Sequence, residues 1–289
     1  MSGGAQIVLS AQHARLALEA RQIGSPAVVL SLDLGLSTAE LPLHDAGLLL
    51  PTGDYLGWGC LEEVAAAPTS CFVVERGSVR KIQAFSALTN RYYSLFPTAG
   101  APTMLAAGLP MHRVQDTDPW RDTLSKIKAA GLAQRRAHWR VLDTCTGLGY
   151  TAIAAARAAD EVVTIELDPA AQEIARHNPW SRPLFELPTI RRLIGDSADL
   201  IEQFEEASFA CVIHDPPAFA LAGELYGLRF YQQLWRVLRS GGRLFHYIGD
   251  LDSKSGARVA RGVMERLRQA GFPRVVPRYE AFGVAAVKE

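Results

Sequence analysis

Short apolar runs alternate with helix-like segments through the second half of the chain, from about Trp139 onward. The first four runs have the length of buried strands and lie at 140–142, 161–165, 190–194 and 209–213. This alternation predicts an α/β fold with a doubly wound, mostly parallel sheet. The pattern continues with a helix over 221–238, a break at Gly241–Gly242, a fifth strand at 243–248 and a helix over 257–270. The last two runs, 274–280 and 282–288, are close enough to form a hairpin and complete a seven-stranded sheet.

The first part of the chain has a mixed pattern that predicts a small α+β domain. We expect helices at 8–23 and 61–67 and strands at 27–34, 46–51, 71–75 and 79–85. The stretch 97–110 is rich in Pro, Gly, Ala and Thr and is typical of a loop or linker. Asp118 then caps a helix through about residue 130, with Lys126 and Lys128 near its end. We therefore expect an N-terminal domain over 1–117 and a second domain over 118–289.

A glycine-containing turn joins the first strand of the second domain to its helix. Gly147 and Gly149 let the backbone pass close to a ligand at the carboxyl end of this strand. The next strand ends in Glu166, 17 residues beyond Gly149, where an acid is placed to bind a ribose diol. Ala152 replaces the third glycine of a dinucleotide fingerprint, and Asp143 adds a carboxylate that would repel a pyrophosphate. These details favour a cationic sulfonium nucleoside over a nicotinamide dinucleotide.

Two further acids follow strands of the same predicted sheet. Asp196 comes after the strand at 190–194, and Asp215 follows the strand at 209–213 within His214-Asp-Pro-Pro217. Ligands of open α/β sheets bind at the carboxyl ends of strands. Prolines 216 and 217 stiffen the second loop, which suits the Asp215 carboxylate to orienting an amine.

This ordered series of residues resembles the motifs of class I S-adenosylmethionine (SAM)-dependent methyltransferases. The chain is also similar to a little-characterised family of methyltransferases common in archaea, through Leu142–Ala152, His177–Ser181, His214–Pro217 and Gly242–Tyr247. The resemblance implies a Rossmann-like fold with SAM as cofactor. It implies that the methionine end faces Asp143 and the glycine turn, the ribose faces Glu166, and the adenine faces Asp196. The residues assigned to the cofactor site are thus Asp143, Thr146, Gly147, Gly149, Tyr150, Glu166 and Asp196.

Asp215, Pro216 and Pro217 resemble the Asp-Pro-Pro-aromatic motif of amino-group methyltransferases, which implies a catalytic role. The aromatic residue comes one position late, as Phe219, so it either stacks on a substrate base or packs under the loop. His214 and His246 end adjacent strands, where they either contact substrate or are buried and hydrogen-bonded. Asp196 and Glu166 taken singly are also compatible with helix caps or surface acids. The cysteines form no CxxC pair, no metal site is expected, and Cys145 is expected to be structural.

Composition and charge constrain the setting. With 48% hydrophobic and 21% charged residues the chain is a folding globular protein, and it has neither a bilayer-length apolar run nor an evident secretory signal. A reduced, cytoplasmic protein is therefore expected. The zero net charge hides a net −6 over residues 1–75 and a net +8 over 76–140. The basic stretch is either a phosphate-binding surface, as for RNA, or a solvated surface that offsets the acidic segment.

Three functions follow from these observations. The first is SAM-dependent N-methylation, with RNA or another anionic molecule as substrate. The second keeps the fold and uses decarboxylated SAM for aminopropyl transfer to a polyamine, which predicts an acidic site. The third is a non-catalytic SAM- or RNA-binding module, against which the intact Asp215-Pro-Pro loop argues. The oligomeric state is not predicted.

Overall fold

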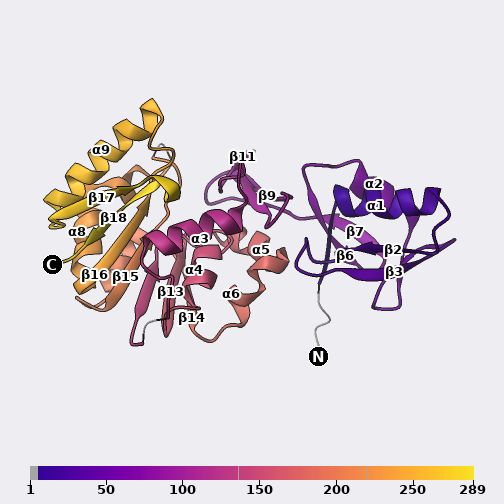
Figure 1. The fold of residues 1–289 in the computed structure, drawn as a ribbon, viewed down its shortest axis with the longest axis horizontal. Helices are drawn as coiled ribbons and strands as arrows, with labels where there is room; N and C mark the ends of the chain where they lie inside the picture. Colours follow the sequence, from indigo (N-terminus) through magenta and orange to yellow (C-terminus); the bar gives the residue numbers. More distant parts are fainter. Residues whose placement is uncertain (1–5, 136, 220) are drawn as a thin grey trace. The chain divides into compact units, whose positions relative to one another are not determined.

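The computed structural model describes residues 6–135, 137–219 and 221–289. Contacts within the chain divide it into two compact units (Figure 1). The first unit comprises Met1–Pro119 and Ala170–Arg182, and the second comprises Trp120–Pro169 and Pro183–Glu289.

A seven-stranded sheet forms the centre of the second unit (Figure 1). Its strands are β12 (Arg140–Asp143), β13 (Glu161–Glu166), β14 (Ile190–Ile194), β15 (Phe209–His214), β16 (Leu238–Tyr247), β17 (Arg274–Arg278) and β18 (Gly283–Val287). Their order is β14-β13-β12-β15-β16-β18-β17. The first five are parallel, whereas β18 runs antiparallel to both β16 and β17. The predicted mostly parallel seven-stranded sheet of the class I methyltransferase type is confirmed.

Helices cover both faces of this sheet. Helices α8 (Leu228–Val237) and α9 (Lys254–Gln269) bury Leu234 and Leu267 in one core with Val212 of β15. Neighbouring strand residues point to opposite faces, and the Cys211 thiol lies 3.8 Å from the carbonyl oxygen of Ala130 on the other face. That carbonyl directly follows α3 (Pro119–Ala129). The other helical segments are α4 (Tyr150–Ala155), α5 (Pro169–His177), α6 (Arg182–Glu186), α7 (Ser197–Leu200), η1 (Pro179–Ser181), η2 (Ile201–Gln203), η3 (Gly223–Tyr226) and η4 (Tyr279–Ala281).

Over residues 6–119 the first unit combines the helices α1 and α2 with three small antiparallel sheets, so the predicted N-terminal α+β domain is confirmed. Sheet orders are β1-β6-β7, β2-β3-β4-β5 and β11-β10-β9-β8. The elements are β1 (Ile7–Ser10), α1 (Ala11–Gln22), β2 (Ala27–Leu30), β3 (Ala39–His44), β4 (Gly47–Leu49), β5 (Tyr55–Leu56), α2 (Trp58–Ala65), β6 (Cys71–Glu75), β7 (Ser78–Lys81), β8 (Gln83–Ser86), β9 (Arg91–Phe96), β10 (Thr103–Ala106) and β11 (Leu109–Pro110). Leu9, Leu61 and Phe72 belong to one apolar core that joins a helix to strands.

Residues 170–182 group with the first unit, although a boundary at 117/118 assigns them to the second domain. His177, at the end of α5, shares a 2.9 Å hydrogen bond between its Nδ1 and the Nε2 of Gln6. The indole N–H of Trp180 donates to the carbonyl of Leu34 at 3.0 Å. These contacts join the segment to residues more than 140 positions earlier in the chain.

Two predictions for the first unit are wrong. The helix expected over 8–23 begins only at Ala11, because residues 7–10 form β1 and pair with β6. The linker expected over 97–110 contains β10 and β11, which pair with each other, and β10 also pairs with β9. In both places strand pairing prevails over the local composition, with distant residues for β1 and with neighbouring strands for β10.

The junction before the fifth strand of the second unit also differs from the prediction. The helix expected over 221–238 consists of η3 followed by α8, and Leu238 already belongs to β16. Gly241 lies inside β16 with φ +71, so the glycine pair forms an irregularity within the strand rather than a break before it.

Candidate functional site

Four acidic residues lie at one edge of the seven-stranded sheet. Asp143 ends β12, Glu166 ends β13, Asp215 directly follows β15, and Asp196 lies two residues beyond β14. These four strands are parallel, so their carboxyl ends meet at the same edge. The structure thus brings together the acids that the sequence analysis assigned to one site.

The two glycines of the turn after β12 have different surroundings. Gly147 has φ +53, and a Cβ built on it would find no atom within 4 Å. Gly149 has φ +79, and its Cβ would lie 2.6 Å from a methyl carbon of Leu184. Gly149 is therefore required for packing, whereas Gly147 leaves the room that close approach of a ligand needs.

Glu166 joins the glycine turn to the loop after β13. Its Oε2 accepts the N–H of Gly147 at 2.8 Å, and its Oε1 accepts the N–H of Asp168 at 3.0 Å. Burial raises the pKa of Glu166 to about 7, although these backbone donors oppose the rise. Each carboxylate oxygen has a second lone pair, so Glu166 can hold the loop and still accept a ligand hydroxyl.

Asp143 is fully buried beneath the turn, where hydroxyl groups satisfy its carboxylate. Thr164 donates to its Oδ2 at 2.6 Å and Thr151 to its Oδ1 at 3.0 Å, and Thr146 lies 2.6 Å from the Thr164 hydroxyl. Burial raises the pKa of Asp143 to about 7, with the two threonine hydrogen bonds opposing. Asp143 and Thr146 thus fix the turn from below.

Asp196 and Tyr150 have partners of their own at this edge. The Oδ1 of Asp196 accepts the N–H of Ala198 at 2.7 Å and caps α7. The buried ring of Tyr150 contacts the edge of the Trp120 ring, with centroids 6.0 Å apart. The cap that the sequence left open for Asp196 is present, and its cofactor role stays a prediction.

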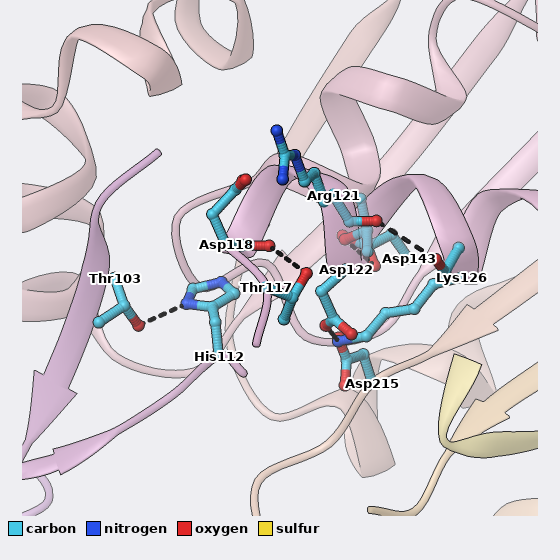
Figure 2. Close-up of polar contacts among 11 residues, drawn as sticks. Thr103, His112, Thr117, Asp118, Arg121, Asp122, Lys126, Asp143 and Asp215 are labelled. Carbon is cyan, nitrogen blue, oxygen red and sulfur yellow. Dashed lines mark hydrogen bonds and ion pairs between the residues drawn. The ribbon is translucent and has the colours of Figure 1, made fainter. Parts of the chain in front are cut away.

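Asp215 forms an ion pair that the sequence analysis missed. The Nζ of Lys126, from α3, donates to Asp215 Oδ2 at 2.6 Å and lies 2.9 Å from Asp122 Oδ2 (Figure 2). The Lys126 side chain is 3% exposed, Asp122 is fully buried, and the Asp215 side chain is 18% exposed. Lys126 is the only protein partner of Asp215 among the described residues, so its Oδ1 keeps its acceptor capacity.

The lysine also lies over the ring of Tyr247, with Nζ 4.1 Å from the ring centroid. Burial alone would lower the pKa of Lys126, but the Asp215 and Asp122 carboxylates outweigh it and raise that pKa above its usual value. The ammonium therefore stays charged. Burial raises the pKa of Asp215, and the charge and hydrogen bond of Lys126 oppose that rise.

The two prolines after Asp215 lead to a loop that leaves Phe219 accessible. Pro216 is buried, and the carbonyl of Pro217 accepts the Tyr226 hydroxyl at 3.0 Å. Phe219 is 52% exposed and meets the Tyr226 ring edge-on, with centroids 5.3 Å apart. Its ring is therefore not packed under the loop, and a stacking role stays a prediction.

His214 and His246 meet inside the unit, with ring centroids 4.3 Å apart. His214 donates from Nε2 to the carbonyl of Leu225 at 2.9 Å, and its Nδ1 lies 2.7 Å from the Thr144 hydroxyl. His246 Nε2 shares a 2.9 Å hydrogen bond with the hydroxyl of Tyr231. Burial lowers the pKa of His214 to about 3 and that of His246 well below its usual value. Both rings are buried and neutral, and each makes an internal hydrogen bond, while Nδ1 of His246 has no hydrogen-bond partner among the described residues. This geometry gives no support to substrate contact.

Acids neutralise much of the basic stretch at 76–140. Arg80 pairs with Glu75 at 3.0 Å, Arg135 with Asp160 at 2.6 Å, and Arg140 with Glu161 at 2.8 Å, in addition to the buried Lys126. The charge excess counted along the sequence therefore overstates the free positive charge of this stretch.

The cysteines and the helices add two structural facts. All four cysteines are free, and burial raises the pKa of the Cys145 thiol well above its usual value, which disfavours a nucleophilic thiolate. Among the described residues, no helix has both the length and the apolar character to span a membrane, and no group of three or more potential ligands could hold a metal ion.

Comparison with known proteins identifies a relative that matches most of this chain. The uncharacterized protein MJ1233 of Methanocaldococcus jannaschii is 44% identical to this chain over 240 residues, which span 82% of the chain and 80% of the relative. The chain belongs to the MJ1233 family. A family model described as "Conserved hypothetical protein 95" also matches residues 108–226, a segment that contains the four strand-end acids and Lys126.

Two further proteins are similar to this chain, one in part of its sequence and one in its fold. The chain is 33% identical over 126 residues to polyamine aminopropyltransferase 2 of Streptomyces coelicolor, but it spans only 22% of that protein. A spermidine synthase solved in complex with the transition state analogue AdoDATO matches with a TM-score of 0.57 and 18% identity, over 72% of this chain and 73% of that one. The structural match supports the class I methyltransferase-like fold.

Proposed function

We propose that this member of the MJ1233 family is a SAM-dependent transferase that methylates an amine nitrogen. The observation that carries the proposal is the Asp215 carboxylate, which stands at the same sheet edge as the glycine turn and Glu166. One of its oxygens is bound by Lys126, and the other has acceptor capacity to spare.

The residues at this edge fit a sulfonium nucleoside. Gly147 offers open space beside the turn, Glu166 has remaining lone pairs for a ribose diol, and Asp196 supplies a further acceptor beyond β14. Asp143 supports the turn rather than facing the ligand, because it is fully buried and both of its oxygens are bound to threonines. When bound, such a cofactor supplies an electrophilic carbon attached to a positively charged sulfur.

The chemistry left to the protein is positioning and proton acceptance. Asp215 accepts an N–H of the substrate amine, which aligns the nitrogen lone pair with the transferred carbon. A nitrogen–carbon bond forms while the carbon–sulfur bond breaks, and the electron pair of that bond stays on sulfur. The nitrogen proton passes to Asp215 or to solvent.

Aminopropyl transfer from decarboxylated SAM is the second candidate, and the charge at the edge favours it. Asp122, Asp143, Glu166, Asp196 and Asp215 lie on or next to this edge, and the ion pairs found among the described residues there join Lys126 to Asp122 and Asp215. Such an excess of acids suits a cationic polyamine, in line with the local match to a polyamine aminopropyltransferase. Internal pairing of the basic stretch weakens the support for RNA, which we retain as the macromolecular acceptor to test.

Calorimetry separates the two cofactors. We expect the full-length protein to bind SAM and S-adenosylhomocysteine, and Glu166→Ala to weaken both by about tenfold or more through loss of the ribose contact. Glu202→Ala is the matched control, since Glu202 pairs with the exposed Arg229 on the surface. Absence of binding by any SAM-type nucleoside would overturn the proposal, and tighter binding of decarboxylated SAM would move the assignment to aminopropyl transfer.

Labelled SAM and labelled decarboxylated SAM, each incubated with small amines and with total RNA, identify the acceptor. Label transferred to amines from SAM supports N-methylation, and label transferred to RNA supports the macromolecular acceptor. Labelling of carbon or oxygen atoms alone would contradict the amine role given to Asp215.

A further inference from the structure

Lys126 connects a helix that precedes the sheet to the loop that follows its fourth strand. The two residues of the pair, Lys126 and Asp215, are 89 positions apart in the chain and meet at 2.6 Å (Figure 2). Asp122, one turn earlier on α3, contacts the same nitrogen at 2.9 Å. The result is a buried lysine between two carboxylates, only one of which reaches solvent.

A contribution to the free energy of folding does not by itself explain this buried triad. Each charge taken out of water costs several kcal/mol, and a well-packed apolar replacement is commonly as stable as a buried ion pair. The second carboxylate leaves the triad with a net charge of −1, which stability does not require. A role at the adjoining sheet edge accounts for this negative charge, because packing of the triad does not require it.

The geometry limits what the Asp215 carboxylate can do. Lys126 binds Oδ2, so rotation of the carboxylate is restricted and Oδ1 is the oxygen left to accept a hydrogen bond. The ammonium itself is held by Asp122 and by the face of the Tyr247 ring. A carboxylate fixed in this way is pre-organised for one direction of approach.

We propose that Lys126 is the positioning residue of the transferase: it fixes the Asp215 carboxylate and favours its ionised form, so that Oδ1 receives the N–H of the amine substrate. Asp122 holds the lysine in place. This inference rests on the proposed function, because it assigns Asp215 the contact with the amine.

Removal of the Lys126 side chain should change the ionisation of the neighbouring carboxylates more than the conformation of the site. Two carboxylates that share a site without a cation cannot both ionise easily, so one of them takes up a proton near neutral pH. The titratable groups that act on Asp215 or on Lys126 are Lys126, Asp122, Asp143, Cys145, Tyr226 and Tyr247. Lys126 is the one cation among them, so only acidic and neutral groups remain around Asp215 in Lys126→Met.

The first test is the pH profile of kcat/KM with the amine acceptor. We expect Lys126→Met to move the acid limb upward by about one pH unit or more, a tenfold loss of activity at the lower pH. Lys126→Met/Asp122→Asn removes the competing carboxylate and should return at least half of that shift. Equal losses at every pH in both variants, or a profile for Lys126→Met that matches the wild type, would overturn the proposal.

A second measurement needs no catalytic activity. In protein labelled with ¹³C at aspartate carboxyl carbons, the Asp215 signal is assigned by its loss in Asp215→Asn. We expect the Asp215 signal of the wild type to titrate about one pH unit or more below the carboxyl signal that titrates in Lys126→Met, and the midpoint to move back toward the wild-type value in the double variant. A wild-type midpoint equal to or above that of Lys126→Met would refute the role of Lys126.

Calorimetry with S-adenosylhomocysteine serves as the control for folding. The affinity for S-adenosylhomocysteine should change by less than about threefold in both lysine variants, because Lys126 acts on Asp215, which contacts the amine substrate and not the nucleoside. If the wild-type protein does not bind the nucleoside, the proposed function fails. The carboxyl titration still decides the role of Lys126 in that case.

Discussion

Two halves of one sheet edge hold their acids in different ways. At β12 and β13, Asp143 and Glu166 are bound by threonine hydroxyls and backbone N–H groups, all of them neutral donors. At β15, Asp215 is bound by the charged Lys126. Burial raises the pKa of Asp143 and of Glu166 to about 7, opposed by neutral donors. Burial also raises the pKa of Asp215, but there the charge and hydrogen bond of Lys126 oppose the rise. Neutral donors suit acids that shape a loop, and a charged donor suits an acid whose ionised form must accept an N–H group.

Asp215→Asn should produce the largest effect on this comparison. We expect transfer to fall about 10³-fold, since an amide cannot accept the proton and leaves Lys126 with Asp122 alone. The affinity for S-adenosylhomocysteine, measured by calorimetry, should stay within about twofold. Full transfer activity in this variant would mean that the β15 half of the edge does not handle the amine.

Gly149→Ala should have the next largest effect, on stability. The added Cβ meets Leu184 at 2.6 Å in a backbone conformation with φ +79, so we expect the free energy of unfolding to fall by about 3 kcal/mol. Gly147→Ala is the matched control: its φ is +53 and the space is open, so a loss of about 1 kcal/mol is expected. Urea unfolding of both variants measures the difference, and equal losses would contradict the separate roles given to the two glycines.

Asp143→Asn should produce the smallest effect, visible as a pH dependence. With a pKa of about 7 in the folded protein, Asp143 holds a proton at pH 5 that the unfolded chain has largely released. Raising the pH to 8 removes that proton and lowers the free energy of unfolding by about 2 kcal/mol from this group. When unfolding in urea is measured at both pH values, the free energy of unfolding of Asp143→Asn should lack this part of the decrease. An identical pH dependence in both proteins would place the Asp143 pKa near its ordinary value.

The sequence predicted the sheet edge better than the contacts beneath it. Apolar runs and the turn residues place Asp143, Glu166, Asp196 and Asp215 at strand ends, because strand length and parallel order follow from local pattern. The partners of those acids are different. Lys126 falls near the end of a predicted helix, where a cation is expected for its effect on the helix dipole. Its spacing of four residues from Asp122 was the one local signal of the triad.

Charge and strand pairing in the first half were harder to infer. The excess of basic residues over 76–140 is partly cancelled by Glu75, Asp160 and Glu161, all of which lie outside the stretch in sequence. β10 lies in a segment whose composition is typical of loops, and it is stabilised by pairing with β9 and β11. Such contacts depend on tertiary structure, which composition and periodicity do not encode.

The segment 170–182 has a practical consequence for dissecting this protein. The chain passes between the two units at 119/120, at 169/170 and again at 182/183. A fragment starting at residue 118 would carry α5 without Gln6 and Leu34, and a fragment ending at 117 would lose His177 and Trp180. Truncation therefore cannot isolate either unit intact, and any exchange of N-terminal regions between relatives has to transplant α5 along with them.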